Sequence, residues 1–288
     1  MNKMLHVKNF ASLVKISHTV FAMPFALVGY FLAVRQAQEL RWDILLLVAL
    51  CMFFARNAAM SFNRYADRKF DAANPRTASR EIPRGVVLPG HAMLFCIVNA
   101  TLFIAASFFI NRLCFALSPV ALALVLGYSY TKRFTALCHF ILGLGLSVAP
   151  IGAYIAVSGA FAVTPILFSA AVLLWSGSFD IIYALPDEAL DKQQRLHSVP
   201  AALGRKVALW LSAAVHLLCC VVILWIGFYA MNNIFYWIGA LLFTGCLIYQ
   251  HLIVSVNDIS KVNVAFAVVN GIASIIFAFF CIVGLMAT

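Results

Sequence analysis

Nine long apolar runs dominate the sequence and constrain its fold more than any other feature. Each is roughly 18 to 25 residues long, the length that an α-helix needs to cross the hydrocarbon core of a bilayer. Of the 288 residues, 64% are hydrophobic and 10% are charged, whereas a soluble domain carries about 25% charged residues. We therefore predict an all-α, multi-pass membrane bundle of about nine transmembrane helices, near residues 16–34, 42–61, 91–110, 113–130, 136–157, 163–183, 207–230, 235–255 and 263–287.

The cationic residues indicate how this bundle is oriented. A formal net charge of +10 would suit a nucleic-acid-binding protein, but basic residues in a membrane protein collect in its cytoplasmic loops. If the N-terminus is cytoplasmic, sixteen of the twenty Lys and Arg residues fall inside, and only Arg35, Arg41 and Arg112 fall outside. We therefore expect a protein of the cell inner (cytoplasmic) membrane with a cytoplasmic N-terminus, an external C-terminus and no nucleic-acid partner.

Two connections, residues 62–90 and 184–206, are much longer and more charged than the others. Long loops in a chain with otherwise short connections commonly carry function. Both follow even-numbered helices, so we expect both on the same face of the membrane. Seven of the ten acidic residues lie in or beside them, namely Asp67, Asp71, Glu81, Asp180, Asp187, Glu188 and Asp191.

The spacing of these acidic residues predicts a metal site. Asn63, Asp67 and Asp71 are spaced i, i+4, i+8, which places an amide and two carboxylates on one face of a helix. Asp187 and Asp191 repeat the i, i+4 spacing in the second segment. Clustered carboxylates repel each other without a cation, and oxygen ligands favour Mg²⁺. With the many Arg and Lys residues nearby, this composition is typical of a site for a phosphorylated ligand.

The two acidic pairs also indicate a weak internal repeat. Asp67 and Asp71 recur 120 residues later as Asp187 and Asp191, on the expected same face. We expect a single transmembrane domain over 1–288, built from two quasi-repeats at roughly 1–135 and 136–288. Asp180 lies about a turn inside the sixth predicted helix, where an ionisable group is a functional candidate; pairing with Arg56 of the second helix is the alternative role.

Two stretches match a known family. The sequence N-R-Y-A-D-R-K-F-D at 63–71 resembles the N-x-x-x-D-x-x-x-D motif of the UbiA superfamily of intramembrane prenyltransferases. The sequence Y-A-L-P-D-E-A-L-D at 183–191 resembles its second motif, Y-x-x-x-D-x-x-x-D. The segment Y-S-Y-T-K-R at 128–133 and the helix count agree with the family, so the resemblance covers nearly the whole chain.

The resemblance implies a fold, a cofactor and a set of site residues. It implies a nine-helix bundle with a central cavity that opens to the cytoplasmic face and laterally to lipid. Two Mg²⁺ ions and the diphosphate of a polyprenyl donor would be bound by Asn63, Asp67, Asp71, Asp187 and Asp191. Further contacts to the diphosphate are expected from Lys15, Arg68, Tyr128, Ser129, Lys132 and Arg133. Asp180 and Tyr183 would lie near an aromatic acceptor, with Asp180 as a candidate base.

The resemblance is less close where the acceptor is expected. His18 and His139 replace residues that enzymes prenylating 4-hydroxybenzoate carry near that end, so both are assigned to the acceptor pocket. With N-P-R-T-A-S-R-E-I-P from Asn74, the chain looks more like the MqnP-type branch, which is assigned to menaquinone synthesis with a dihydroxynaphthoate-type acceptor. Pro186, directly before Asp187, is expected to kink or restart the helix.

The function expected from these residues is Mg²⁺-dependent transfer of a polyprenyl group to an aromatic acid, in ubiquinone or menaquinone synthesis. The expected partners are the two substrates and the lipid bilayer, with no obligatory protein partner. Two alternatives stay open. One is a transporter that uses the acidic cluster to pass cations, although transport sites usually lie near the membrane midplane. The other is a family member whose acceptor is haem, a chlorin or a glycerophosphate.

Overall fold

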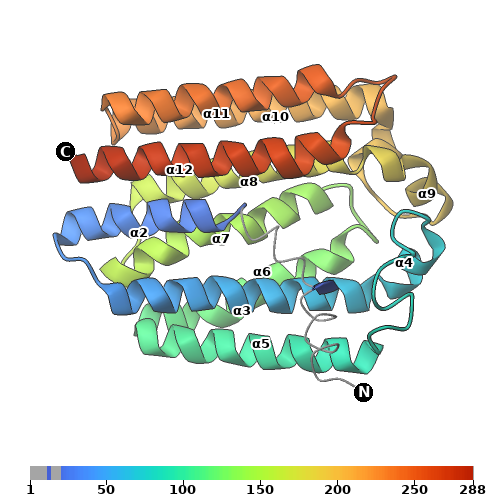
Figure 1. Cartoon of the computed structure of the whole chain (residues 1–288), viewed down its shortest axis with the longest axis horizontal. Helices are drawn as coiled ribbons and strands as arrows, with labels where there is room; N and C mark the ends of the chain where they lie inside the picture. The colour runs from blue at the N-terminus through green and yellow to red at the C-terminus, as the bar shows by residue number, and fades with distance from the viewer. Residues whose placement is uncertain (1–11, 14–20, 288) are drawn as a thin grey trace.

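The chain folds into a bundle of long, roughly aligned helices (Figure 1). The computed structural model describes residues 12–13 and 21–287, and no strand occurs within these ranges. The long helices are α2 (Met23–Ala37), α3 (Trp42–Ala66), α5 (Pro89–Ile110), α6 (Arg112–Thr131), α7 (Cys138–Ser158), α8 (Val163–Tyr183), α10 (Val199–Tyr229), α11 (Ile234–Ile253) and α12 (Asn270–Ala287). The π-helical turn η3 (Val264–Val269) leads into α12, and three short helices are α4 (Arg68–Ala73), η2 (Leu185–Asp187) and α9 (Glu188–Gln193).

The predicted all-α, multi-pass bundle is confirmed. Within the described ranges, eight helical segments are long and apolar enough to cross a membrane. The ninth long helix, α2, has 15 described residues and lies alongside the others (Figure 1). It takes the place of the first predicted helix, part of which lies outside the described residues. The division into two quasi-repeats stays a prediction.

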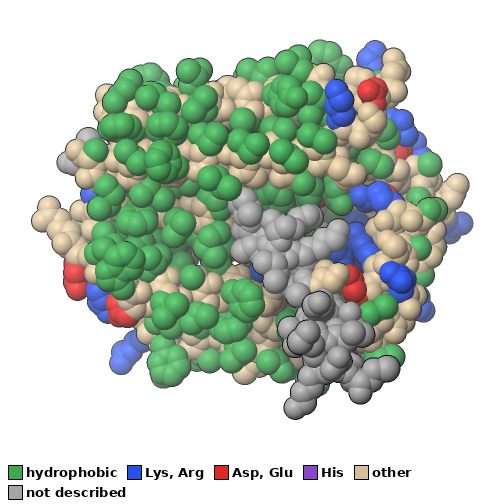
Figure 2. All heavy atoms as spheres, viewed as in Figure 1, with side chains coloured by type: hydrophobic (Ala, Val, Ile, Leu, Met, Phe, Trp, Pro, Cys, Tyr) green, Lys and Arg blue, Asp and Glu red, His purple; other side chains and the backbone are tan. Residues whose placement is uncertain are grey.

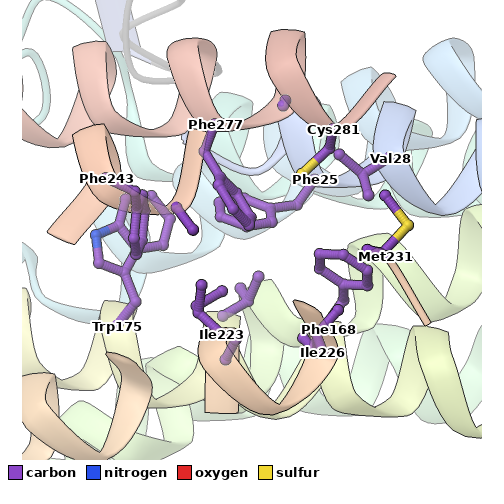
Figure 3. Packing of buried hydrophobic residues seen from close by; sticks show 14 of the residues in the cluster. Phe25, Val28, Phe168, Trp175, Ile223, Ile226, Met231, Phe243, Phe277 and Cys281 are labelled. Atoms are coloured by element: carbon purple, nitrogen blue, oxygen red, sulfur yellow. The ribbon is translucent and has the colours of Figure 1, made fainter. Parts of the chain in front are cut away.

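An aromatic core joins α2, α8, α11 and α12. Phe25 of α2 lies 5.2 Å from Trp175 of α8, and Phe243 of α11 lies 5.1 Å from Phe277 of α12, measured between ring centroids (Figure 3). All four side chains are at most 1% exposed. Lipid is as apolar as these rings, so close packing and not the exclusion of water stabilises such contacts within a bilayer. This core holds one half of the bundle together.

Gly29 allows α2 and α7 to approach each other closely. A Cβ atom at this position would lie 2.0 Å from the carbonyl oxygen of Pro150 in α7. Small residues at helix contacts serve this purpose in membrane proteins, because backbones can then meet without a side chain between them. The contact fixes α2 against the helix that carries His139.

Most charged side chains lie at one end of the bundle. Figure 2 shows hydrophobic side chains over the length of the helices and charged side chains at both ends, with more Lys and Arg at the end where α4 and α9 lie. α4 and α9 belong to the two long connections of the sequence, and Figure 1 places them next to each other. The expected placement of both connections at one face is therefore confirmed, whereas the cytoplasmic identity of that face stays a prediction.

Two helix boundaries test the sequence predictions, and one of them differs. Pro186 lies in the 3₁₀ turn η2, and α9 restarts at Glu188, so the predicted restart is confirmed. The seventh predicted helix was expected from residue 207, but α10 begins at Val199 and is kinked at Gly204, whose φ is 77°. The Ser198 side chain caps this early start by accepting from the Ala201 N–H, a role that an apolar-run reading does not detect.

Candidate active site

A cavity of about 290 Å³ lies at the charged end of the bundle, between the two acidic segments. Its walls come from α3, α4, α6, α7, α8, η2, α9, η3 and the connections that follow α4 and α9. The residues that line it include all five predicted metal ligands, Asn63, Asp67, Asp71, Asp187 and Asp191. Segments 120 residues apart in the sequence therefore meet around one space, as the same-face prediction requires.

The first acidic motif keeps one helical face across the boundary between α3 and α4. The Asp67 N–H donates to the Asn63 carbonyl at 2.9 Å, and the Asp71 N–H donates to the Asp67 carbonyl at 2.8 Å. This i→i−4 pattern continues the helix through Asp67, so the three side chains line up as the spacing predicts. The Asn63 amide also donates to Asp67 Oδ2 at 3.1 Å.

Arginines from nearby segments neutralise the two carboxylates of this motif. Arg133 lies 3.4 Å from Asp67, and Arg80 lies 2.6 Å from Asp71. Burial raises the pKa of Asp67 above its usual value, and the charges of Lys132 and Arg133 oppose that rise. The site thus stabilises carboxylates in a buried setting by surrounding them with cations.

The two carboxylates of the second acidic motif are bound by residues of different segments. Asp187 forms a salt bridge with Arg76 and accepts from the Asn74 amide at 3.0 Å. Asp191, which is 7% exposed, accepts from the Ser198 hydroxyl at 2.8 Å. Pro186 therefore bends the chain without removing Asp187 from the cavity.

Some buried polar atoms at the cavity have no partner among the described residues. Asp71 Oδ2 and Arg64 Nε are both in this position. A buried polar atom without a hydrogen bond is costly, so each is suited to a ligand of opposite charge. The donor set of carboxylate and amide oxygens fits a hard divalent cation such as Mg²⁺, and the arginines fit phosphate oxygens.

The predicted diphosphate-binding residues divide into two groups. Tyr128, Ser129 and Lys132 line the cavity. Arg68 instead donates to the Tyr65 carbonyl at 2.7 Å with its guanidinium over the Tyr65 ring, and Arg133 reaches Asp67 from behind. Neither is among the described residues that line the cavity. The predicted Lys15 and His18 lie outside the described residues.

The predicted acceptor residues lie at the inner side of the same cavity. His139, Asp180 and Tyr183 all line it. Asp180 Oδ2 lies 2.6 Å from His139 Nδ1, so His139 is a hydrogen-bond partner of Asp180 where the sequence suggested Arg56. The Tyr183 ring stacks on Phe266, with ring centroids 4.0 Å apart.

A second, mainly apolar cavity of about 380 Å³ adjoins the first. It lies between α3, α6 and α7, with side chains such as Met52, Leu124 and Ile151 in its walls. The two cavities share five lining residues, Arg56, Met60, Tyr128, Leu142 and Leu146. A ligand with a charged head and a long apolar tail fits this pair of spaces.

Sequence reasoning placed three arginines near the site only as cations of one segment, and it assigned no role to Phe266. Arg64, Arg76 and Arg80 line the cavity or hold its carboxylates, and Phe266 reaches it from η3. The sequence shows Arg64, Arg76 and Arg80 only as cations of the segment 62–90. Their individual partners depend on how that segment folds. For Phe266 the sequence carries no signal beyond an apolar run.

Comparison with known proteins identifies the family. Residues 22–286 match the UbiA prenyltransferase family. A 4-hydroxybenzoate octaprenyltransferase of Tolumonas auensis is 31% identical over 237 residues, which make up 82% of each chain. One from Nitrosospira multiformis is 31% identical over 241 residues, 83% of this chain and 82% of that one.

Solved structures give the same result. The apo structure of a UbiA homolog from Aeropyrum pernix K1 is 28% identical, with a TM-score of 0.80 over 94% of this chain and 98% of that chain. A UbiA homolog from Archaeoglobus fulgidus bound to GPP and Mg²⁺ shares the fold at 18% identity, with a TM-score of 0.74 over 96% of this chain and 99% of that one. The chain therefore belongs to the UbiA prenyltransferase family and is a prenyltransferase of the membrane.

Proposed function

We propose that this protein transfers a polyprenyl group from a polyprenyl diphosphate to an aromatic acid, with Mg²⁺ as cofactor. The observation that carries the proposal is the convergence of Asn63, both acidic pairs and a set of arginines on one cavity that adjoins an apolar one. The curated relatives are named for octaprenyl transfer to 4-hydroxybenzoate. The substrate pair is thus a charged, long-tailed donor and a planar acid.

The metal would be held by the oxygens of Asn63, Asp67, Asp71, Asp187 and Asp191. Mg²⁺ bound there supplies charge to stabilise the leaving diphosphate. We expect two ions, because the carboxylates lie on two walls of the cavity. The unpartnered Asp71 Oδ2 supports this assignment, as does the Mg²⁺ bound together with GPP in the Archaeoglobus homolog.

The protein's own residues bind and orient the donor. Lys132 and Arg64 face the space where the diphosphate would lie, and the apolar cavity would receive the prenyl chain. When the allylic C–O bond breaks, positive charge develops on the prenyl carbon. The rings of Phe179 and Phe266 line the charged cavity and can stabilise the positive charge on the prenyl carbon through their faces. Apolar walls exclude water, which would otherwise capture the cation.

The acceptor would bind between the diphosphate and the ring pair of Tyr183 and Phe266. The edges of these two stacked rings would contact the planar acid. The ring carbon attacks the prenyl cation, a C–C bond forms, and the proton on that carbon passes to the Asp180 carboxylate. Diphosphate is the other product.

The aromatic acid that accepts the prenyl group is one of two classes. The choice lies between 4-hydroxybenzoate, which the names of the relatives favour, and a dihydroxynaphthoate-type acid, which His18 and His139 favour by resemblance. Either acid places the enzyme in ubiquinone or menaquinone synthesis at the inner membrane. The excess of Lys and Arg at one end supports a cytoplasmic N-terminus and a cytoplasmic cavity mouth. We propose no obligatory protein partner.

The test is a Mg²⁺-dependent assay in membranes that contain the protein. A polyprenyl diphosphate is offered with 4-hydroxybenzoate or with a dihydroxynaphthoate acid, in separate reactions with and without EDTA. Prenylation of either acid that EDTA abolishes would support the function and identify the acceptor. Donor binding without transfer to either acid would indicate another acceptor, and ion flux in proteoliposomes without donor binding would indicate a transporter.

A further inference from the structure

We propose that His139 is a positioning residue that holds Asp180 as an ionised base aimed into the cavity, and that it does not itself bind the acceptor. This inference rests on the proposed function and deepens it. It starts from the two ring nitrogens of His139, which are both bonded to the protein. Nδ1 lies 2.6 Å from Asp180 Oδ2, and Nε2 lies 3.1 Å from the Val199 backbone nitrogen.

The Val199 contact determines where the imidazole proton sits. A backbone N–H can only donate, so Nε2 must be the nitrogen without a proton. Nδ1 then carries the proton and donates it to Asp180. The ring is 2% exposed, so a doubly protonated ring would press two N–H groups against each other at a buried position. His139 is therefore neutral, in a single tautomer.

Asp180 keeps accepting capacity toward the cavity. Its side chain is 23% exposed while that of His139 is 3% exposed, and both residues line the cavity. One carboxylate oxygen, Oδ2, is fixed by the histidine, which sets the orientation of the group. A donor N–H on a carboxylate stabilises its ionised form, which is the form that can take a proton.

The anchor of His139 is part of the same turn that holds the second acidic motif. Ser198 donates to Asp191 and caps α10, and Val199 is the next residue. The peptide that orients the candidate base is thus adjacent to the residue that fixes a candidate metal ligand. The two halves of the reaction, donor ionisation and proton removal, share one structural element.

A buried histidine pair elsewhere in the bundle shows what a purely structural arrangement looks like. His216 Nδ1 lies 2.9 Å from His251 Nε2 between α10 and α11. Neither residue lines either cavity, and neither contacts a carboxylate among the described residues. The combination of a carboxylate partner, a backbone anchor and a cavity wall belongs to His139.

In the proposed reaction, Asp180 receives the proton that the acceptor ring loses. The acceptor ring carbon bonds to the prenyl carbon as the donor C–O bond breaks and diphosphate leaves with its electron pair. The arenium ion then loses its ring proton to Asp180, and the C–H electron pair restores aromaticity. His139 gains and loses no proton in this step, so its substitution should slow proton removal and leave donor ionisation unchanged.

The experiment compares His139→Leu, His139→Gln and Asp180→Asn with the wild-type enzyme in membranes. Transfer is measured with the acceptor acid bearing hydrogen or deuterium at the prenylated ring carbon. Release of diphosphate without an acceptor reports ionisation alone. The Gln amide presents one donor and one acceptor, as the neutral imidazole does, so His139→Gln should keep transfer within about tenfold of wild type. His91→Gln, on the exposed face of α5, is the matched control.

We expect His139→Leu to lower kcat by about 100-fold or more, with donor KM and diphosphate release near wild type. A deuterium isotope effect should appear in His139→Leu and in Asp180→Asn, because proton removal becomes rate-limiting. Loss of diphosphate release in parallel with transfer in both His139 variants would overturn the inference in favour of a structural role. Wild-type kcat in His139→Leu would also overturn it. An inactive wild-type enzyme would instead overturn the proposed function, and this inference with it.

Discussion

Asn270 hydrogen-bonds the π-turn that carries Phe266, and we predict that Asn270→Leu lowers the stability of the bundle and also changes the geometry of the cavity. The Asn270 side chain is 0% exposed and makes four hydrogen bonds. It accepts from Trp175 at 2.9 Å and from Gln250 at 2.7 Å. It donates to the carbonyls of Ala265 and Phe266, both at 3.2 Å. These bonds give the two carbonyls of the π-turn η3 a hydrogen-bond donor.

The magnitude follows from the two bonds that cross between helices. Interhelical hydrogen bonds in membrane proteins contribute about 0.6 kcal/mol on average and about 1.7 kcal/mol at most. Asn270→Leu removes two, from α8 and α11, so unfolding should become about 1 to 3 kcal/mol easier. Without its anchor η3 should relax toward a regular helix, because π-turns persist only where something holds them. Phe266 would then leave Tyr183, and the KM for the acceptor should rise while that for the donor stays constant.

The assay combines thermal unfolding in detergent with steady-state kinetics for both substrates. Asn99→Leu is the matched control, because Asn99 is also buried and accepts from Asn57 at 3.2 Å, between α3 and α5. Asn99→Leu should lower the free energy of unfolding by about 0.6 kcal/mol and leave the acceptor KM unchanged. An unchanged acceptor KM in Asn270→Leu, or an equal rise in both variants, would refute the link between η3 and the cavity.

Two further substitutions test the packing and the charge balance. Gly29→Ala places a methyl group against the Pro150 carbonyl and should destabilise the protein by about 1 to 3 kcal/mol, measured by thermal unfolding; an unchanged midpoint would contradict the close approach of α2 and α7. Arg80→Met leaves the Asp71 carboxylate buried without its partner and should cost about 3 kcal/mol, part of which Mg²⁺ should restore. Arg84→Met, at an exposed loop position, should change neither quantity, and a stable Arg80→Met protein insensitive to Mg²⁺ would argue against the metal assignment.

The parts of the fold and site that follow helical periodicity were predictable. Nine apolar runs of membrane-spanning length fixed the class of fold, and the i, i+4 spacing of Asp67 and Asp71 fixed a shared face. Because both acidic segments follow even-numbered helices, it could also be predicted that Asp187 lies at the same end of the bundle as Asp67 and Asp71. These inferences depend on local geometry and on the parity of membrane crossings.

The parts that depend on tertiary contacts were not predictable. The anchor of His139 is a backbone N–H 60 residues away, at Val199, and nothing in the composition of either segment indicates it. Resemblance assigned His139 to the acceptor pocket, and the structure adds that both of its nitrogens are already bonded. Phe266 lines the cavity from the π-turn η3, and an apolar run in the sequence does not reveal such a turn.

The central claim, that the two acidic segments form one site for metal and diphosphate, is tested most directly by donor binding. Binding of a polyprenyl diphosphate with Mg²⁺ is measured calorimetrically for wild type, Asp67→Asn, Asp187→Asn and the double variant. A shared site predicts that either substitution abolishes Mg²⁺-dependent binding and that the double variant is no worse than the single ones. Retained binding in either single variant, or losses that simply add in the double variant, would contradict the claim.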